Sequence, residues 1–281
     1  MLHRTYGPWS YRVPEFEVEH YPFTGKRLVL DRARFADHDL IVQEDGRLWV
    51  EWQSNGPPLI YVVTDSILSD RHYRDRFQQA AYADLTLVDM DDLARFEGED
   101  RRVARCSYSV NDHLFYDRGL PKVIDVGVYM NLNAPERRTM AAFLEDACRR
   151  RGWSLDVSTY VGERYAEAFN RTRIAVHLER TPTVRAHRLF DAMACRTCVL
   201  TSPEPAVSGE ERQAGMHYRE WTDLVDLEQQ IDALLTTGEW EQVAQAGYEL
   251  VHRAHTWAVR ARQLRTLLGQ AFPQLTGEAR G

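Results

Sequence analysis

The sequence has few cysteines and no long hydrophobic run. Its 281 residues include only four cysteines, far below the density that small secreted domains use for a disulfide framework. No apolar run approaches the roughly 18 to 20 residues that a membrane span requires. The first residues, MLHRTYGPWSY, lack the apolar stretch of a secretory signal. We therefore expect a soluble, cytoplasmic protein with reduced thiols.

Lysine and net positive charge are also scarce. The only lysines are Lys26 and Lys122, and the formal net charge at pH 7 is −7. This charge argues against a protein whose main task is to coat nucleic acid, because neutralising phosphates requires a cationic surface. The preference for arginine suits phosphate binding, since a guanidinium group forms paired hydrogen bonds with phosphate oxygens. The base composition of a genome can produce the same bias.

Apolar residues are abundant, at 44% of the chain, and they occur in short runs. This amount is sufficient for the cores of two domains or of one large α/β domain. Runs bounded by turn-forming residues, typical of buried parallel strands, lie at 37–42 and 59–64. The elements predicted after them are a helix at 70–82, a strand at 83–90, a short helical piece at 91–96 and a weak strand at 103–106.

A second alternation of strands and helices begins after Gly119 and Pro121, which interrupt the pattern. Its predicted strands are 123–130, 154–161, 173–179 and 198–202, and its predicted helices are 136–151, 163–171 and 186–195. Helical patterns dominate beyond residue 223, at 223–238 and 239–272. The restart predicts two α/β units with a cleft between them.

The stretch HRLFDAMACRTCVLTS, at 187–202, contains two candidate sites. The first is the pair Cys195 and Cys198. Structural zinc needs about four ligands, and no second close pair of Cys or His completes this one. A redox thiol is activated at the amino end of a helix, whereas Cys195 lies at the end of the predicted helix. We interpret both cysteines as packing residues and expect no metal.

The second candidate is the group His187, Arg188 and Asp191, which shares the amino-terminal part of the predicted helix at three- and four-residue spacing. Unpaired N–H groups and a partial positive charge at this end of a helix favour phosphate. An acid one turn further in can accept two hydrogen bonds from a ribose diol. The pattern predicts a nucleotide site, although an ordinary solvated first turn has the same spacing.

The stretch from about Val123 to Leu268 resembles the nucleotide-sugar-binding domain of GT-B glycosyltransferases, in the spore-maturation-protein-like or family 1/4-like branch. Four ordered blocks carry the resemblance: DVGVYMNLNAPERR, YAEAFNRTRIAVHL, HRLFDAMACRTCVLTS and HTWAVR. Asp191 and Arg196 replace a Glu and a Gly of the family, and residues 130–133 replace its glycine-rich turn. A β-carbon at Arg196 is unfavourable if the turn requires a positive φ.

The resemblance implies an α/β, GT-B-like fold of two Rossmann-like domains with an interdomain cleft. It implies an acceptor-side domain at 1–122, for which it is vaguer, with 15–21 the only candidate for the first strand. A nucleotide-sugar-binding domain at 123–255 follows. The amphipathic pattern from Val251 to Leu268 suits a C-terminal helix, within 256–281, that crosses back to the first domain.

The resemblance also implies an enzyme, a hexosyltransferase that moves a sugar from a nucleotide diphosphate sugar to a hydroxyl acceptor. UDP-glucose or a similar sugar is the favoured donor, the anomeric configuration is retained, and neither a metal nor a cofactor is required. Arg188, His187 and the helix end would hold the diphosphate, and Asp191 the ribose. The other residues assigned to the donor site are Asn131, Arg137, Arg138 and Tyr160.

Two residues of the first half are candidates for acting on the acceptor hydroxyl. Asp65 follows a buried strand, at the edge of the sheet where α/β folds place their ligands. We predict that it orients or deprotonates the acceptor, although an acid in this position is often a helix cap. His72 is the second choice.

Two other functions fit the sequence. In the first, a phage-type DNA glucosyltransferase acting on 5-hydroxymethylpyrimidines, arginines of the first half would line a basic groove. They are Arg71, Arg74, Arg76, Arg101, Arg102 and Arg105. The second is a non-catalytic sugar-nucleotide-binding module, which the replacements at Asp191, at Arg196 and in the glycine-rich turn motivate.

Overall fold

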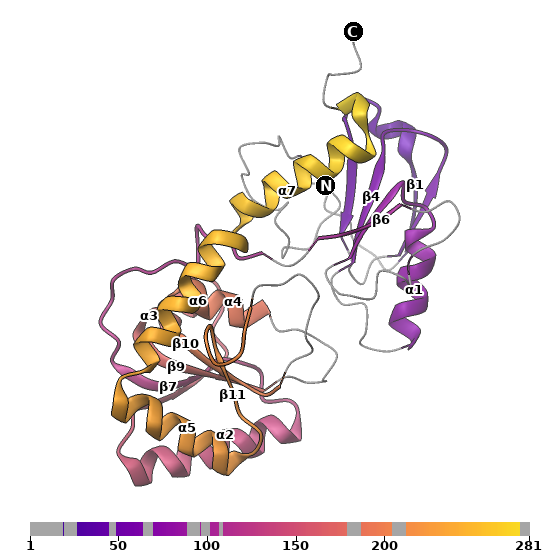
Figure 1. Cartoon of the computed structure of the whole chain (residues 1–281). Helices are drawn as coiled ribbons and strands as arrows, with labels where there is room; N and C mark the ends of the chain where they lie inside the picture. The colour runs from indigo at the N-terminus through magenta and orange to yellow at the C-terminus, as the bar shows by residue number, and fades with distance from the viewer. Residues whose placement is uncertain are drawn as a thin grey trace. The chain divides into compact units, whose positions relative to one another are not determined.

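In the computed structural model, the chain forms two compact units (Figure 1). Unit 1 comprises Met1–Tyr108 and Trp257–Gly281, and unit 2 comprises Ser109–Thr256. The structure describes residues 19, 27–44, 49–63, 70–88, 96, 102–106, 109–178, 187–203 and 212–275. Within these residues, no helix is both long and apolar enough to cross a membrane.

Unit 1 is built on a four-stranded parallel sheet. Its strand order is β2-β4-β5-β6, formed by Ile41–Glu44, Leu59–Val63, Leu85–Val88 and Val103–Arg105. A separate parallel pair joins β1 (Arg27–Asp31) to β3 (Trp49–Gln53). Every residue of β4 and β5 is buried, which explains why their sequences are continuous apolar runs rather than alternating ones.

Helices cover both faces of this four-stranded sheet. On one face, Ile60 and Leu87 pack against Leu264 and Leu268 of α7 (Trp257–Ala271), drawn in yellow in Figure 1. On the other face, Tyr61 and neighbouring apolar residues pack against α1 (Asp70–Ala80). The short helices η2 (Arg32–Phe35) and η4 (Pro273–Leu275) complete the described part of the unit. Helix α7 thus supplies part of the core of unit 1 from a distant part of the sequence.

Unit 2 is a five-stranded parallel sheet with strand order β11-β10-β9-β7-β8. In chain order the strands are β7 (Ile124–Val128), β8 (Leu155–Val157), β9 (Thr172–His177), β10 (Cys198–Thr201) and β11 (Arg219–Glu220). The connecting helices are α2 (Pro135–Arg151), α3 (Glu163–Arg171) and α4 (His187–Ala194), and α5 (Leu224–Thr237) and α6 (Trp240–Ala254) follow. This arrangement is a doubly wound α/β fold.

The two faces of the unit 2 sheet carry different helices (Figure 1). Ile174 and Val176 of β9 belong to a buried cluster with Leu144 of α2 and Ile231 of α5. Ala175, which alternates with them, faces the side on which Leu189 and Ala192 of α4 lie. The sheet is therefore buried on both faces.

Several elements differ from the sequence prediction, and the strand predicted at 154–161 is only Leu155–Val157. Strands β1, β3 and β11 were not predicted, and the strand predicted at 37–42 lies at Ile41–Glu44. The long helix predicted at 239–272 is two helices, α6 and α7, separated by His255 and Thr256. The candidate strand at 15–21 lies outside the described residues except for Glu19, and the helical piece at 91–96 lies outside them except for Phe96.

Candidate functional site

The order of the strands in unit 2 indicates where a ligand binds. From β7 the chain adds β8 on one side and then β9 on the other, so the direction of strand addition reverses between β7 and β9. In doubly wound folds, ligands bind at this switch point, beyond the carboxyl ends of the strands. Tyr129 follows β7 directly and His177 is the last residue of β9. Both lie at this end of the sheet.

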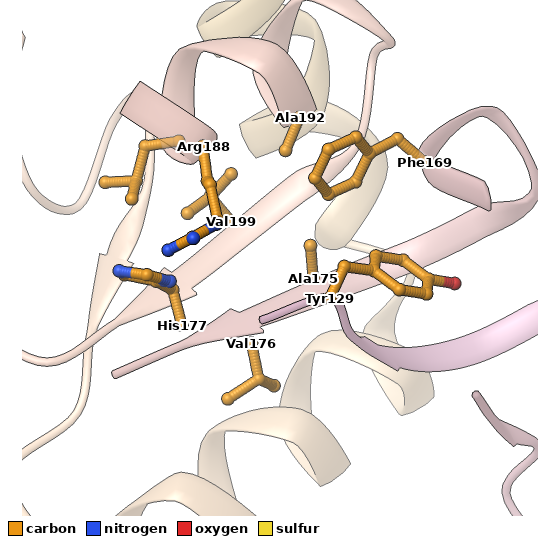
Figure 2. A pocket seen from close by; sticks show the side chains of 9 residues that line it. Tyr129, Phe169, Ala175, Val176, His177, Arg188, Ala192 and Val199 are labelled. Carbon is orange, nitrogen blue, oxygen red and sulfur yellow. The ribbon is translucent and has the colours of Figure 1, made fainter. Parts of the chain in front are cut away.

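A shallow pocket opens at this position (Figure 2), and the empty space in it and at its solvent-filled mouth is about 250 Å³. Its lining residues are Tyr129, Phe169, Ala175, Val176, His177, Arg188, Leu189, Ala192 and Val199. Small side chains from three elements, Ala175 of β9, Ala192 of α4 and Val199 of β10, leave the space open. The pocket lies entirely within unit 2.

Two nitrogen-bearing side chains border the pocket. Figure 2 shows the guanidinium group of Arg188 and the imidazole ring of His177 directed toward the same space. Arg188 lies in the first turn of α4, where the helix dipole adds positive potential. His177 is only 5% exposed, and its backbone carbonyl accepts a 3.1 Å hydrogen bond from the Ser202 N–H group. This arrangement suits an anion.

Asp191 lies one turn further along α4 and is 6% exposed. Near it is the buried hydroxyl of Tyr165, from α3. Burial raises the pKa of this hydroxyl; the Asp191 carboxylate raises it further, whereas the Arg188 guanidinium lowers it. Tyr165 therefore remains a neutral phenol under the influence of both charges, that of Arg188 and that of Asp191.

The arginines that begin α2 contact backbone carbonyl groups. The guanidinium of Arg137, which is 2% exposed, donates to the Leu178 carbonyl at 2.9 and 3.1 Å. A third nitrogen donates to the carbonyl and side-chain oxygens of Asn131 at 3.4 Å. Arg138, which is exposed, donates to the carbonyls of Leu132 and Asn133. Both arginines brace the β7–α2 loop, and Arg137 also joins it to the end of β9.

Two aromatic rings, Tyr129 and Phe169, line the pocket, and Tyr160 contacts the first of them. The centroid of the Tyr129 ring lies 5.3 Å from that of Phe169 and 6.1 Å from that of Tyr160. The Tyr129 hydroxyl forms a 2.7 Å hydrogen bond with the Thr172 hydroxyl. A β-carbon at Gly127 would lie 2.5 Å from the Tyr129 ring, so this glycine permits the ring's position. Tyr160 is 38% exposed and presents an accessible aromatic face.

The two cysteines of the 187–202 stretch are packing residues in the structure. Cys195 and Cys198 are both fully buried and unpaired. Burial raises the pKa of both thiols, that of Cys198 to about 12, so neither is activated as a thiolate. Arg196 between them has a φ of 53°. The turn therefore does require a positive φ, and here arginine adopts it.

Three of the predicted side chains fall outside the described part of the structure. Asp65 is not among the described residues, and His72 and His187 are described only as helical backbone. His177, by contrast, borders the pocket and was not predicted from the sequence. The signal that could have identified it is the alternation in RIAVHL, which places Ala175 and His177 on one face of a strand that ends at the switch point.

Comparison with known proteins agrees with this architecture. Residues 132–266 match the family model described as glycosyl transferase-like. Sucrose-phosphate synthase from Thermosynechococcus elongatus has a similar structure, with a TM-score of 0.56, 16% identity, and coverage of 79% of this chain and 69% of that one. HepE from Anabaena, in complex with UDP-glucose, has a TM-score of 0.56 and 13% sequence identity, and the match covers 76% of this chain and 72% of that one.

A third similar structure, TarM of S. aureus, gives a TM-score of 0.58 and 8% identity, covering 76% of this chain and 51% of that one. No curated protein matches the sequence. Residues 132–266 are thus similar to the glycosyl transferase-like family, and the chain has the fold of the GT-B glycosyltransferases.

Proposed function

We propose that the protein transfers a sugar from a nucleotide diphosphate sugar, with UDP-glucose or a similar UDP-sugar favoured, to a hydroxyl acceptor. The observation that carries this proposal is the Arg188-lined pocket at the switch point of a domain that matches the glycosyltransferase family. The structurally similar HepE was crystallised with UDP-glucose and with UDP and glucose, which favours a uridine nucleotide.

In this proposal, the start of α4 holds the donor. Arg188 and the amino end of the helix, with His187, bind the diphosphate, because both carry positive charge. Asp191 accepts hydrogen bonds from the ribose diol, and Tyr160 offers its exposed ring to the base. Arg137 and Arg138 order the loop that contains Asn131 beside the phosphates.

The chemistry requires stabilisation of a departing diphosphate. As the glycosidic bond breaks, positive charge develops on the sugar and negative charge on the leaving oxygen. Arg188 and the dipole of α4 stabilise the charge on the leaving oxygen without reorganising. Electrostatic stabilisation of this kind is usually the largest single contribution to catalysis. We include retention of the anomeric configuration in the proposal, and the NMR coupling constant of the product's anomeric proton tests it.

The acceptor hydroxyl is oriented or deprotonated by Asp65, with His72 as the second candidate. If Asp65 has this role, Asp65→Asn lowers turnover by about 10²-fold or more and leaves donor affinity unchanged. Turnover is measured with saturating donor and a panel of hydroxyl acceptors. An Asp65→Asn enzyme with unchanged turnover would remove this residue from the mechanism.

The donor proposal is tested by calorimetric titration with UDP. Arg188→Ala is expected to weaken UDP affinity by about 2–3 kcal/mol, roughly 30- to 150-fold, because a charge-assisted contact is lost. Arg149→Ala is a matched control, since Arg149 lies exposed on α2 and pairs with Asp146 on the same helix. Equal affinity of wild type and Arg188→Ala would contradict the phosphate-binding role.

Assays of the wild-type protein with labelled nucleotide sugars and with DNA distinguish the alternative functions. Binding without hydrolysis of, or transfer from, labelled nucleotide sugars would identify a non-catalytic module. Salt-sensitive retention on DNA would favour a hydroxymethylated DNA acceptor. Of the arginines suggested for that groove, Arg76 is buried and Arg102 donates to the carbonyl of Ala271, so these two are engaged within unit 1.

A further inference from the structure

His177 is a buried polar residue that lines the pocket and has no role in the function proposed above. It ends β9, beside the point where the strand order reverses. Its backbone is held by the ladder with β10, in register with Thr201, and by the hydrogen bond from Ser202 N–H to its carbonyl. The imidazole ring therefore projects from a rigid part of the sheet, which a precise binding site requires.

The direction of the imidazole follows from the geometry of the strand. Successive side chains of β9 alternate between the faces of the sheet. Ile174 and Val176 enter the apolar core beside α2 and α5, whereas Ala175 and His177 lie on the α4 side, at the pocket. Ala175 and Ala192 are too small to fill the space next to the ring. One side of the imidazole therefore borders an open volume, as Figure 2 shows.

The chemical character of this space is set by two donor groups. An imidazole carries at least one N–H donor in either protonation state, and a guanidinium carries five. Two such groups from separate elements, facing one space, are suited to a ligand with several oxygen acceptors close together. A diphosphate has this property, with non-bridging oxygens on both phosphorus atoms. A sugar hydroxyl or a base edge does not need two adjacent nitrogen donors of this kind.

We propose that His177 is a second diphosphate-binding residue, which donates a hydrogen bond to one phosphate oxygen while Arg188 binds another. This inference rests on the proposed function, because it assigns a further residue to the same donor site. Arg188 provides charge from a flexible side chain, and His177 provides a fixed donor from the sheet. Together they define the position of the leaving diphosphate relative to the strand ends.

The test measures whether His177 recognises phosphate specifically. The nucleoside diphosphate that most raises the melting temperature of the wild-type full chain is selected from UDP, GDP, ADP and dTDP. Its affinity and that of its nucleoside are then measured by calorimetry for wild type and His177→Leu. We expect the diphosphate to bind about tenfold to hundredfold more weakly to His177→Leu, and the nucleoside to bind unchanged, because it lacks phosphate.

Two further variants separate binding from folding. His177→Gln retains an N–H donor and is expected to recover part of the lost diphosphate affinity. His217→Gln is the matched control: His217 is a buried histidine of unit 2 outside the pocket, and its ring accepts a hydrogen bond from Gln213 N–H. Circular dichroism and melting temperature show whether each variant is folded. If His177→Leu does not fold, the diphosphate and nucleoside affinities of His177→Gln are used to test the role of His177.

The outcomes distinguish this inference from the proposed function. Three results would show that His177 does not bind the diphosphate. Its replacement by leucine could lower diphosphate affinity by less than about threefold, or lower nucleoside affinity by the same factor as diphosphate affinity. His217→Gln could also lower diphosphate affinity as much as His177→Leu does. The donor-site proposal survives that result provided that Arg188→Ala still weakens binding. If no nucleoside diphosphate binds the wild type, both the proposed function and the role of His177 are wrong.

Discussion

Arg196, two residues beyond the end of helix α4, has a backbone φ of 53°, a left-handed conformation that is unfavourable for residues with a β-carbon. Its guanidinium lies 3.5 Å from the Asp117 carboxylate, but a half-exposed ion pair contributes little. We expect Arg196→Gly to raise the free energy of unfolding by about 0.5–1 kcal/mol, since relief of backbone strain exceeds the added entropy of the unfolded chain. Urea unfolding measures the change.

The control for this prediction is Arg196→Ala, which removes the same ion pair and keeps the β-carbon. If the alanine variant is as stable as the glycine variant, the strain at this position is negligible. The position also shows the limit of a family resemblance. The sequence pattern predicts the turn correctly, but only the coordinates show that arginine accepts the left-handed conformation instead of reshaping the turn.

At the scale of elements, the buried thiols of β10 and of the end of α4 make stability depend on pH. Burial raises the pKa of Cys198 from 9.0 to about 12. A thiol with a raised pKa in the folded state contributes fully to stability below pH 9. Above pH 9 this contribution is lost, because the unfolded chain releases the proton first. The free energy of unfolding therefore falls as pH rises from 9 toward 12.

Cys198→Ala isolates this dependence. The variant loses packing at every pH, but it has no thiol to ionise in the unfolded chain. Its deficit relative to wild type is expected to shrink by about 1.4 kcal/mol between pH 7 and pH 10, one pKa unit above the unfolded value. Urea unfolding at the two pH values gives both deficits. A deficit that stays constant with pH would mean that the Cys198 thiol ionises equally easily in both states.

The same scale shows what the sequence could and could not predict. The runs at 59–64 and 198–202 were predictable because both faces of a central parallel strand are buried. β1 and β3 were missed because their half-buried residues alternate over only five positions each. The break between α6 and α7 has no glycine or proline signal; it coincides with a tertiary hydrogen bond from Val110 N–H to the His255 carbonyl.

The candidate site was predictable in part, for the same reason. The position of Arg188 and Asp191 on one helix end is a local property, and helical spacing reveals it. The place of His177 depends on the strand order, which brings β9 next to β7, and sequence spacing carries no information about that neighbour. The buried position of Arg137 likewise depends on Leu178, 41 residues away in the chain.

At the scale of the whole molecule, each unit has its own core, and α7 belongs to that of unit 1. Leu264 of α7 is 1% exposed and packs in the cluster that contains Ile60 and Leu87. We expect Leu264→Ala to destabilise unit 1 by about 2–5 kcal/mol, with little effect on unit 2. Hydrogen exchange followed by mass spectrometry reports the two units separately.

In that experiment, faster exchange in β4 and β5, with unchanged exchange in β9 and β10, supports the assignment of α7 to unit 1. Acceleration of equal size in both units would show that they unfold as one cooperative body. Leu227→Ala is the reciprocal control, because Leu227 is fully buried in the cluster of unit 2, and its effect should be confined to that unit.

Because α7 follows unit 2 in the chain, the two units cannot be completed in the order in which they are synthesised. A ribosome releases residues 1–108 first, yet the sheet face that includes Ile60 and Leu87 stays uncovered until residues 257–275 have emerged. Unit 2, which is continuous in sequence, can close its core earlier. While unit 2 is translated, the nascent chain therefore lacks the α7 side chains that pack on this sheet face, and transiently exposed apolar surface of this kind favours aggregation.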